Sequence, residues 1–346
     1  MKNRKIKLAV VGIGVMGVKH IDAINKTSNA KLTAVVDFKK NSIINKINAN
    51  FYSSIKDMFK SETIDGVIIA TPNSSHFRDG LEVIRNKCPV LIEKPITIRS
   101  VDTDKLITEA KKKRVQILVG HHRRHNPVML KAKELIDNNL LGKVRTVNIN
   151  CQMFKPNNYF KEAHWKKNDG AGPIFVNLIH DLDLMNFLFG KIVKVFSMSK
   201  NSLRGFANED VSGAVLEFKN GIIATFLTSD SVASPWSWEL TARENDIYPS
   251  TEESSYLIGG TKASMSLPNL KLWQHSKNGH WFTPISGIKY PYKFSDPLVN
   301  QIEHFCKVIE KKEKPIITAS IANETIKVIE AIKLSSKSKK LVELKN

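Results

Sequence analysis

The pattern of hydrophobic and polar positions changes once along the chain, near residue 143. Before that point, short apolar runs alternate with stretches in which apolar residues recur every three or four positions. Such alternation predicts a parallel sheet whose strands are joined by right-handed helical crossovers. The predicted strands cover residues 5–11, 31–36, 64–70, 89–93 and 115–119. The predicted helices cover residues 15–26, 42–48, 54–60, 101–113 and 128–138, and one more follows the turn at 71–76, whose Asn or Ser can cap it, and ends near residue 86.

After residue 143 the period becomes two. Apolar Val147, Ile149 and Cys151 alternate with polar residues, which is typical of a half-buried antiparallel strand. Similar runs predict strands at residues 192–198, 211–218, 222–228, 236–241 and 255–258. Two amphipathic helices, at 298–309 and 321–334, and a short strand at 340–344 are predicted near the end.

These patterns divide the chain into two expected domains. A chain of 346 residues exceeds the size at which one hydrophobic core usually stops growing. We expect an α/β dinucleotide-binding domain over residues 1–125 and an α+β domain with an open-faced, mainly antiparallel sheet over residues 126–346. The run 222–227 is apolar on both faces, which favours burial against the sheet of another subunit in a homodimer or homotetramer.

The first chemical motif is a glycine turn between the first strand and the first helix. Gly12, Gly14 and Gly17 form the pattern GxGxxG, with Val15 and Met16 inside it. In such a turn the first glycine makes the bend, the second lets backbone approach a pyrophosphate, and the third lets helix and strand pack closely.

The second strand supports this interpretation because it ends in Asp37, twenty residues after Gly17. A carboxylate there accepts the ribose hydroxyls of NAD and repels the 2′-phosphate of NADP. Lys39 and Lys40 follow and partly offset that repulsion, so NAD is the expected cofactor and NADP stays an alternative.

The sequence Glu93-Lys94-Pro95 ends another apolar strand. In a parallel sheet, the carboxyl ends of strands line the crevice where ligands bind. Lys94 is therefore placed to transfer a proton, and apolar walls would lower its pKa toward the range of a general acid/base. The alternative is a surface lysine whose charge Glu93 balances.

Residues 120–127 form a dense polar cluster that ends the first sheet. His121, His122 and His125 raise the question of a metal site, but the cluster holds no Cys, Asp or Glu, and the two adjacent histidines point to opposite faces if the chain is extended. We expect no metal here. The favoured interpretation is a hinge that faces cofactor phosphate or substrate, with Arg123 or Arg124 as an anion donor.

The second chemical motif lies in a helix predicted from Pro173 to about Phe189, after a glycine-rich entry. Asn177, His180 and Asp183 form a polar row in this otherwise apolar helix. Such a row must find polar partners or face a cavity. A substrate site at His180 is favoured over a core histidine that Asp183 satisfies.

Composition limits the remaining function classes. The net charge of +20 is spread over the whole chain, so nucleic-acid binding is not favoured. Cys88, Cys151 and Cys306 are too few and too far apart for a disulfide framework, which fits a reducing cytoplasm. The apolar start is broken by glycines and continues into a charged helix, so it is not read as a signal peptide, and no run is long enough for a membrane span.

Taken in order, these motifs resemble those of the Gfo/Idh/MocA oxidoreductases, named for glucose-fructose oxidoreductase and inositol dehydrogenase. The resemblance covers nearly the whole chain. It rests on the glycine motif, Asp37, Ala70-Thr71-Pro72-Asn73 with His76, Glu93-Lys94-Pro95, the region of Arg124 to Pro127, Trp165, and His180 within Ile-His-Asp-Leu-Asp.

The resemblance implies specific roles. Lys94 is the catalytic lysine before a proline that is often cis in the family, and His180 contacts the substrate and assists proton transfer. His122 and Asn177 are expected to bind substrate with them. The expected cofactor-binding residues are Gly12, Gly14, Val15, Met16, Gly17, Asp37, Thr71, Pro72, Asn73, His76, Glu93, Lys94, Arg123 and Trp165.

One departure from the family pattern affects these roles. Many inositol-dehydrogenase-like members carry Asp four residues before the histidine, where this chain has Val176 with Asn177 beside it. An Asp–His relay is therefore not expected. The resemblance implies an NAD(P)-dependent oxidoreductase acting on a sugar, cyclitol or related polyhydroxylated molecule, and the alternative is a non-catalytic NAD-binding regulator on the same fold.

Overall fold

The computed structural model describes residues 4–39, 44–276 and 279–344. The chain forms two compact units, one of Met1–Asn126 with Ser295–Ile326 and one of Pro127–Phe294 with Lys327–Asn346. The division expected at residue 125 placed the whole remainder in one domain. In the structure, residues 295–326 group with the first unit instead, because buried apolar side chains of that segment belong to its core.

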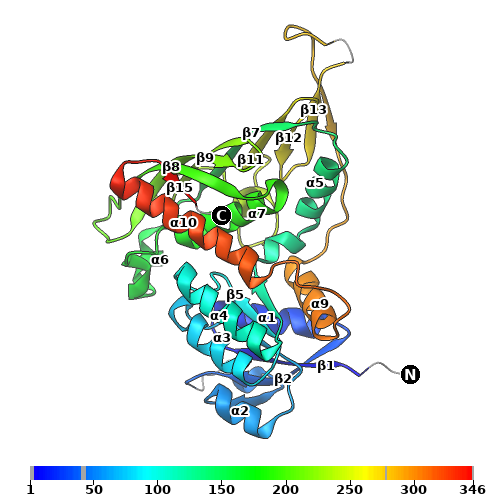
Figure 1. Ribbon diagram of the computed structural model, residues 1–346, viewed down its shortest axis with the longest axis vertical. Helices are drawn as coiled ribbons and strands as arrows, with labels where there is room; N and C mark the ends of the chain where they lie inside the picture. The colour runs from blue at the N-terminus through cyan, green and yellow to red at the C-terminus, as the bar shows by residue number, and fades with distance from the viewer. Residues whose placement is uncertain (1–3, 40–43, 277–278, 345–346) are drawn as a thin grey trace. The chain divides into compact units, whose positions relative to one another are not determined.

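The first unit is built on a six-stranded parallel sheet with the order β3-β2-β1-β4-β5-β6 (Figure 1). Its strands are β1 (Ile6–Val11), β2 (Ala30–Val36), β3 (Asn50–Tyr52), β4 (Gly66–Ile69), β5 (Val90–Glu93) and β6 (Ile117–Gly120). The residues of β4, β5 and β6 are buried throughout, as expected for strands covered on both faces. The order reverses between β1 and β4, which is the switch point where doubly wound sheets bind ligands.

Helices connect these strands. They are α1 (Val15–Lys26), α2 (Ile55–Ser61), α3 (His76–Arg85), α4 (Ser100–Lys113) and, from the returning segment, α9 (Pro297–Ile309). Ile302, Phe305 and Cys306 of α9 are buried in the same core as the sheet. The N-cap of α9 is Asp296, whose side chain accepts the N–H of Leu298.

The second unit contains a nine-stranded sheet with the order β14-β13-β12-β11-β7-β10-β9-β8-β15. Its strands are β7 (Val144–Gln152), β8 (Ile192–Asn201), β9 (Glu209–Phe218), β10 (Ile223–Ser229), β11 (Tyr256–Gly260), β12 (Ser264–Leu267), β13 (Lys271–Gln274), β14 (Ser286–Lys289) and β15 (Val342–Glu343). β7 and β10 run parallel, and the other pairings in the described part of this sheet are antiparallel. The sheet is thus mixed but mainly antiparallel, as predicted.

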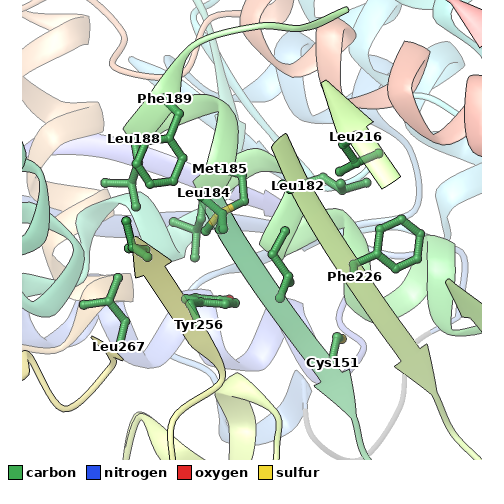
Figure 2. Close-up of a cluster of buried hydrophobic side chains, with 14 of the residues drawn as sticks. Cys151, Leu182, Leu184, Met185, Leu188, Phe189, Leu216, Phe226, Tyr256 and Leu267 are labelled. Carbon is green, nitrogen blue, oxygen red and sulfur yellow. The ribbon is translucent and has the colours of Figure 1, made fainter. Parts of the chain in front are cut away.

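One face of this sheet is covered by helices. They are α5 (Pro127–Asp137), the turn η5 (Ile174–Leu178), α7 (Ile179–Phe189) and the end of α10 (Ala319–Ser338). Figure 2 shows how Leu182 and Met185 of α7 meet Phe226 and Tyr256 of the strands. Nearly every residue of α7 is buried, which explains why its hydrophobic pattern is almost continuous.

The other face of the sheet carries apolar side chains that this unit leaves exposed. Val215, Ile223, Leu227 and Leu257 are 48%, 44%, 52% and 51% exposed, whereas their strand neighbours Leu216, Ala224 and Phe226 are buried. Thr146, Ile223, Leu257 and Trp273 help to line a shallow hollow on this face. The alternation predicted from the sequence is therefore present, with apolar residues on both faces of β10.

Two local predictions were wrong. Residues 236–241, predicted as a strand, contain the short helix α8 (Trp238–Thr241), because Ser237 caps it by accepting the N–H of Leu240 and Trp238 stacks on Tyr256. The helix predicted over 42–48 is a single turn, η1 (Ile44–Lys46), in its described part, followed at once by β3 pairing with β2. Residues 42 and 43 of that prediction lie outside the described residues.

The start of α3 also differs from the prediction. The polar turn before α3 forms the short helix η2 (Asn73–Ser75), and neither Asn73 nor Ser75 caps α3 through its side chain.

Candidate functional site

The glycine turn between β1 and α1 is shaped by close contacts with the neighbouring strand end. Gly12 has φ of +89°, and a Cβ there would lie 2.7 Å from Ala70 O and Thr71 N at the end of β4. A Cβ on Gly17 would lie 1.9 Å from Gly12 O. By contrast, a Cβ on Gly14 would meet nothing within 4 Å. The space beside Gly14 and the amino end of α1 suit a bound pyrophosphate.

Asp37, directly after β2, is held against this turn. Its Oδ2 accepts the N–H of Ile13 at 2.7 Å, and its Oδ1 accepts the N–H of Lys39 at 3.4 Å. The carboxylate thus holds the glycine turn in place. It also lies where a ribose of the cofactor would bind. Lys39 Nζ lies 5.8 Å from the ring centroid of the exposed Phe38. Lys40, the other lysine expected to offset Asp37, lies outside the described residues.

The loop after β4 is held in place by the polar contacts of two side chains. Thr71 Oγ1 donates to Asp79 Oδ2 at 2.8 Å. The buried ring of His76 lies between two carbonyl oxygens, with Nδ1 2.7 Å from Pro95 O and Nε2 2.8 Å from Thr71 O. Both contacts are hydrogen bonds only when both nitrogens carry protons. His76 therefore joins the carboxyl ends of β4 and β5, while Pro72 and Asn73 continue the loop between Thr71 and His76.

Lys94 follows β5 and precedes a cis peptide bond to Pro95. Its backbone N–H donates to Glu93 Oε2 at 3.0 Å. The Glu93 side chain is buried, and its Oε1 lies 2.7 Å from His20 Nε2. Burial opposes ionisation of Glu93, but the hydrogen bond and charge of His20, with the nearby charges of His122 and Lys94, outweigh it and lower its pKa to about 2. An ionised carboxylate therefore lies beside the catalytic lysine expected from the sequence.

Sequence reasoning missed His20 and Gly120 as parts of this cluster. His20 lies on the buried face of α1 with Gly17, Ile21 and Ile24. A histidine in an apolar stripe needs a polar partner, which is the signal that could have revealed it. Gly120 lies opposite Glu93 in β6, where a Cβ would come within 2.8 Å of Glu93 Oε1.

The polar cluster after β6 forms the short helix η3 (His122–His125). The structure brings His122 close enough to Glu93 to affect the pKa of Glu93, so His20, Glu93, Lys94 and His122 form one polar cluster in the first unit. Arg123 is buried in the same turn. Within the described residues, no three His, Cys, Asp or Glu side chains are grouped so that they could hold a metal ion.

In the second unit, the start of the helix that carries His180 is anchored by Glu209 of β9. Glu209 Oε1 accepts the N–H of Ile174 at 3.0 Å, and a Cβ on Gly172 would lie 2.2 Å from the Glu209 carboxyl group. Burial raises the pKa of Glu209, although the N–H of Ile174 acts in the opposite direction. The glycine-rich entry is thus explained by a carboxyl group that packs against it.

The first turn of this helix, η5, is a π-helix rather than an α-helix. Such turns often lie at functional sites. The wider turn contains Val176 and Asn177, and Asn177 Oδ1 accepts a hydrogen bond from Lys155 Nζ at 2.8 Å. His180 and Asp183 follow in α7, and both are buried. The polar row predicted from the sequence is therefore present, but its geometry begins with a turn that the pattern did not indicate.

The sequence did not single out Lys155, Asp230 or Arg204, which form a buried ionic cluster beside Asn177. Lys155 Nζ lies 3.5 Å from Asp230 Oδ2, and Arg204 Nη1 donates to Asp230 Oδ1 at 3.0 Å. These residues are far apart in the sequence, so spacing gives no signal for them. Trp165, expected to contact the cofactor, lies in η4 (His164–Lys167) and is 51% exposed.

Comparison with known families matches both parts of the chain. Residues 6–121 match the family model "Oxidoreductase family, NAD-binding Rossmann fold" of Gfo/Idh/MocA proteins, and residues 133–344 match its "Oxidoreductase family, C-terminal alpha/beta domain". The chain belongs to the Gfo/Idh/MocA oxidoreductase family. It is an NAD-dependent oxidoreductase with a Rossmann domain and a second α/β domain, as the sequence motifs predicted.

Several known proteins are similar to this chain in sequence. An oxidoreductase of Formosa agariphila is 33% identical over 230 residues, which cover 63% of this chain and 70% of the relative. The 2,7-anhydro-N-acetylneuraminate hydratase of Escherichia coli is 28% identical over 76% of this chain and 67% of its own. An inositol 2-dehydrogenase of Rhodococcus erythropolis is 30% identical over 63% of this chain and 64% of its own.

Solved structures of the family share the fold over almost the full length. An NADPH-dependent oxidoreductase from Desulfitobacterium hafniense, so described in its structure, has a TM-score of 0.84 at 20% identity and covers 98% of both chains. The WlbA dehydrogenase from Bordetella pertussis, solved with NADH and UDP-GlcNAcA, has a TM-score of 0.80 at 20% identity over 99% of this chain and 100% of its own. In the described part of this chain, no helix is long and apolar enough to cross a membrane.

Proposed function

We propose that this family member is a dehydrogenase or reductase that transfers hydride between nicotinamide and a sugar, cyclitol or related polyhydroxylated substrate, with Lys94 as general acid/base. The observation that carries the proposal is the cluster of His20, Glu93, Lys94 and His122, with an ionised Glu93, at the carboxyl edge of the parallel sheet. The family comparison and relatives named as inositol dehydrogenases support the same substrate class.

The cofactor residues fit a dinucleotide. Gly12 and Gly17 allow the tight turn, the space beside Gly14 suits a pyrophosphate, and Asp37 suits ribose hydroxyls. Thr71, Pro72, Asn73 and His76 supply the neighbouring strand end. The bound nicotinamide supplies the hydride acceptor or donor. Among the proposed cofactor residues are also Val15, Met16, Glu93, Lys94, Arg123 and Trp165.

The protein's own contribution is placement and proton transfer. When an alcohol carbon loses hydride, its hydroxyl proton leaves to Lys94, and the reverse reaction returns the proton to the carbonyl oxygen. Glu93 is ionised and buried next to Lys94, and its Oε2 holds the lysine backbone in place by accepting the Lys94 N–H. His180, with Asn177 and His122, is proposed to bind substrate hydroxyls and to assist proton transfer.

Substitution of Lys94 tests this assignment. Lys94→Ala is expected to lower kcat about 10²–10⁴-fold while NADH affinity changes little, because only the general acid/base is lost. Lys112→Ala, an exposed lysine on α4, is the matched control. Turnover is followed by NADH fluorescence over a panel of polyols and ketoses, and near-normal turnover by Lys94→Ala would remove Lys94 from this role.

The same screen distinguishes the proposed enzyme from the second hypothesis, a non-catalytic NAD-binding regulator. An enzyme turns over at least one member of the panel. A regulator binds NADH, turns over none of them and co-purifies with a protein partner. The lysine beside a buried, ionised carboxylate favours the enzyme, since cofactor binding alone does not need this pair of residues at the strand end.

We also infer a homodimer or homotetramer through the exposed face of the second sheet. Val215, Ile223, Leu227 and Leu257 expose apolar surface there, and an antiparallel sheet with one bare apolar face favours burial by another copy. The cytoplasmic location expected from the three cysteines stays a prediction.

A further inference from the structure

Lys155 is a buried lysine to which the proposed hydride and proton transfer assign no role. Its position follows from the parallel pairing of β7 and β10, whose carboxyl ends leave the sheet at the same edge. The pairing continues beyond both strands, because the N–H of Met153 donates to Ser229 O and the N–H of Lys155 donates to Asp230 O, each at 2.9 Å. Lys155 and Asp230 are therefore held side by side by backbone.

Arg204 supplies the structural cation of this cluster. Its Nη1 donates to Asp230 Oδ1 at 3.0 Å, and its Nη2 donates to the backbone oxygens of Lys155 and Asp230, both at 2.9 Å. Three hydrogen bonds thus join Arg204 to both strand ends. An arginine fork suits this arrangement, so Lys155 is not needed to hold Asp230 in place.

Lys155 itself is incompletely paired with negative charge. Its Nζ lies 3.5 Å from Asp230 Oδ2, a carboxylate that it shares with Arg204. Glu239 attracts it only weakly from outside ion-pair distance. Burial lowers the pKa of Lys155 although Asp230 opposes the shift, as expected for an ammonium whose lost hydration is not fully replaced.

The ammonium is directed toward the proposed substrate residues. Lys155 Nζ donates at 2.8 Å to Oδ1 of Asn177, a neutral amide three residues before His180. The ring of Tyr159 also lies near Lys155 Nζ, with its centroid 5.2 Å away. An ammonium has three protons, and one hydrogen bond to an amide with one long ion pair leaves capacity for another acceptor.

We propose that Lys155 binds a carboxylate of the substrate, so that the enzyme acts on a sugar acid rather than a neutral sugar or cyclitol. The inference rests on the proposed function and deepens it. A carboxylate would complete the hydrogen bonds of the ammonium and supply the negative charge that Asp230 divides between two cations. A phosphate offers more charge and more acceptors than this one ammonium and its neutral amide neighbour can match, so a single carboxylate is the better fit.

The test compares acidic and neutral ligands by calorimetry on the NADH-bound protein. The probes are D-glucuronate, D-gluconate, D-glucose and D-glucose 6-phosphate. The wild-type protein is expected to bind at least one acid about tenfold or more tightly than glucose, which is the scale of a charge-assisted hydrogen bond. Lys155→Gln should remove this preference, whereas Lys155→Arg should keep part of it.

Two further variants keep the test decisive. Lys161→Gln changes an exposed lysine on the short helix α6 (Asn157–Lys161) and should behave like wild type. Asn177→Asp keeps Lys155 but places a carboxylate beside it, so it should also remove the preference for acids. If Lys155→Gln does not fold, the acid preference of Asn177→Asp tests the carboxylate site in its place.

The outcomes separate this inference from the proposed function. No preference for either acid in wild type, unchanged acid binding in Lys155→Gln, or tighter binding of the phosphate than of both acids would overturn the carboxylate site. Turnover is measured separately. Efficient oxidation of neutral polyols without acid preference would support the proposed dehydrogenase and contradict the carboxylate site. Acid binding without turnover of any probe would support the carboxylate site and contradict the proposed dehydrogenase activity on these probes.

Discussion

Nε2 of His20 lies 2.7 Å from Oε1 of Glu93, and this contact links the helix after the glycine turn to the strand end that carries Lys94. Both side chains are buried. A buried carboxylate that keeps its charge needs such a partner. The dinucleotide turn and the strand end that carries Lys94 are therefore joined by one buried contact inside the first unit.

This pair predicts a specific loss of stability in acid. The pKa of Glu93 is lowered from 4.5 to about 2, so its contribution is present above pH 4.5 and is lost as the pH falls toward 2. The shift corresponds to roughly 3 kcal/mol at most. The difference in unfolding free energy between wild type and Glu93→Gln, from urea titrations, should shrink by this order between pH 5 and pH 2.5.

The control for this experiment is Glu252→Gln, which changes an exposed carboxylate of the second unit. Its difference from wild type should stay nearly constant over the same pH range. A Glu93→Gln difference that is equally constant would show that Glu93 is not held ionised by His20.

The sequence predicted the parts of the fold that repeat. Strand and helix alternation, together with Gly12, Gly14 and Gly17, was enough for the parallel sheet, because these signals are local and periodic. His20 and Glu93 are 73 residues apart, and Lys155 and Asp230 are 75 apart, so their pairing depends on strand order that no local pattern records. The π-helical turn at Asn177 was missed for a related reason, since the anchor that holds its start is Glu209 on another strand.

Two glycines of the turn should differ in their effects when each is replaced by alanine. Gly17→Ala places a Cβ 1.9 Å from Gly12 O, so it should lower the Tm strongly or prevent folding. Gly14→Ala meets no atom within 4 Å and should fold normally, yet it should weaken NADH binding about tenfold or more because the methyl occupies the space proposed for pyrophosphate.

Differential scanning fluorimetry and NADH titration check both variants. Near-normal NADH affinity in Gly14→Ala would place the pyrophosphate elsewhere. A stable, wild-type-like Gly17→Ala would contradict the close packing of turn and helix.

Asp37 should set the preference for NAD over NADP. Its ionised carboxylate favours ribose hydroxyls and opposes a 2′-phosphate. Because Oδ2 also accepts the N–H of Ile13, Asp37→Ser would disturb the turn, whereas Asp37→Asn keeps an oxygen acceptor and removes only the charge. Calorimetry should therefore show tighter binding of NADH than of NADPH in wild type, and a narrower gap in Asp37→Asn. Equal or tighter NADPH binding by wild type would show that the neighbouring lysines dominate.

Oligomerisation should depend on the exposed apolar face of the second sheet. Ile223 pairs with Glu217 on β9 and with Thr146 on β7, so it lies well inside the sheet rather than at an edge. It is 44% exposed within one chain. A carboxylate introduced there would lose its hydration if the face is buried by another copy, at a cost of several kcal/mol, whereas it would stay hydrated in a monomer.

Sedimentation velocity at low micromolar concentration distinguishes the two cases. Obligate interfaces of this kind bury about 2,000 Å² or more, so the wild-type protein should remain at least dimeric on dilution. Ile223→Asp should sediment as a monomer, and its circular dichroism spectrum should show that it is folded. Val101→Asp replaces a comparably exposed apolar residue on α4 of the first unit and should leave the assembly unchanged. A wild-type monomer would end the proposal outright. An intact dimer in Ile223→Asp would move the interface away from the centre of this face, because a buried unpaired carboxylate cannot be accommodated where two apolar sheets meet.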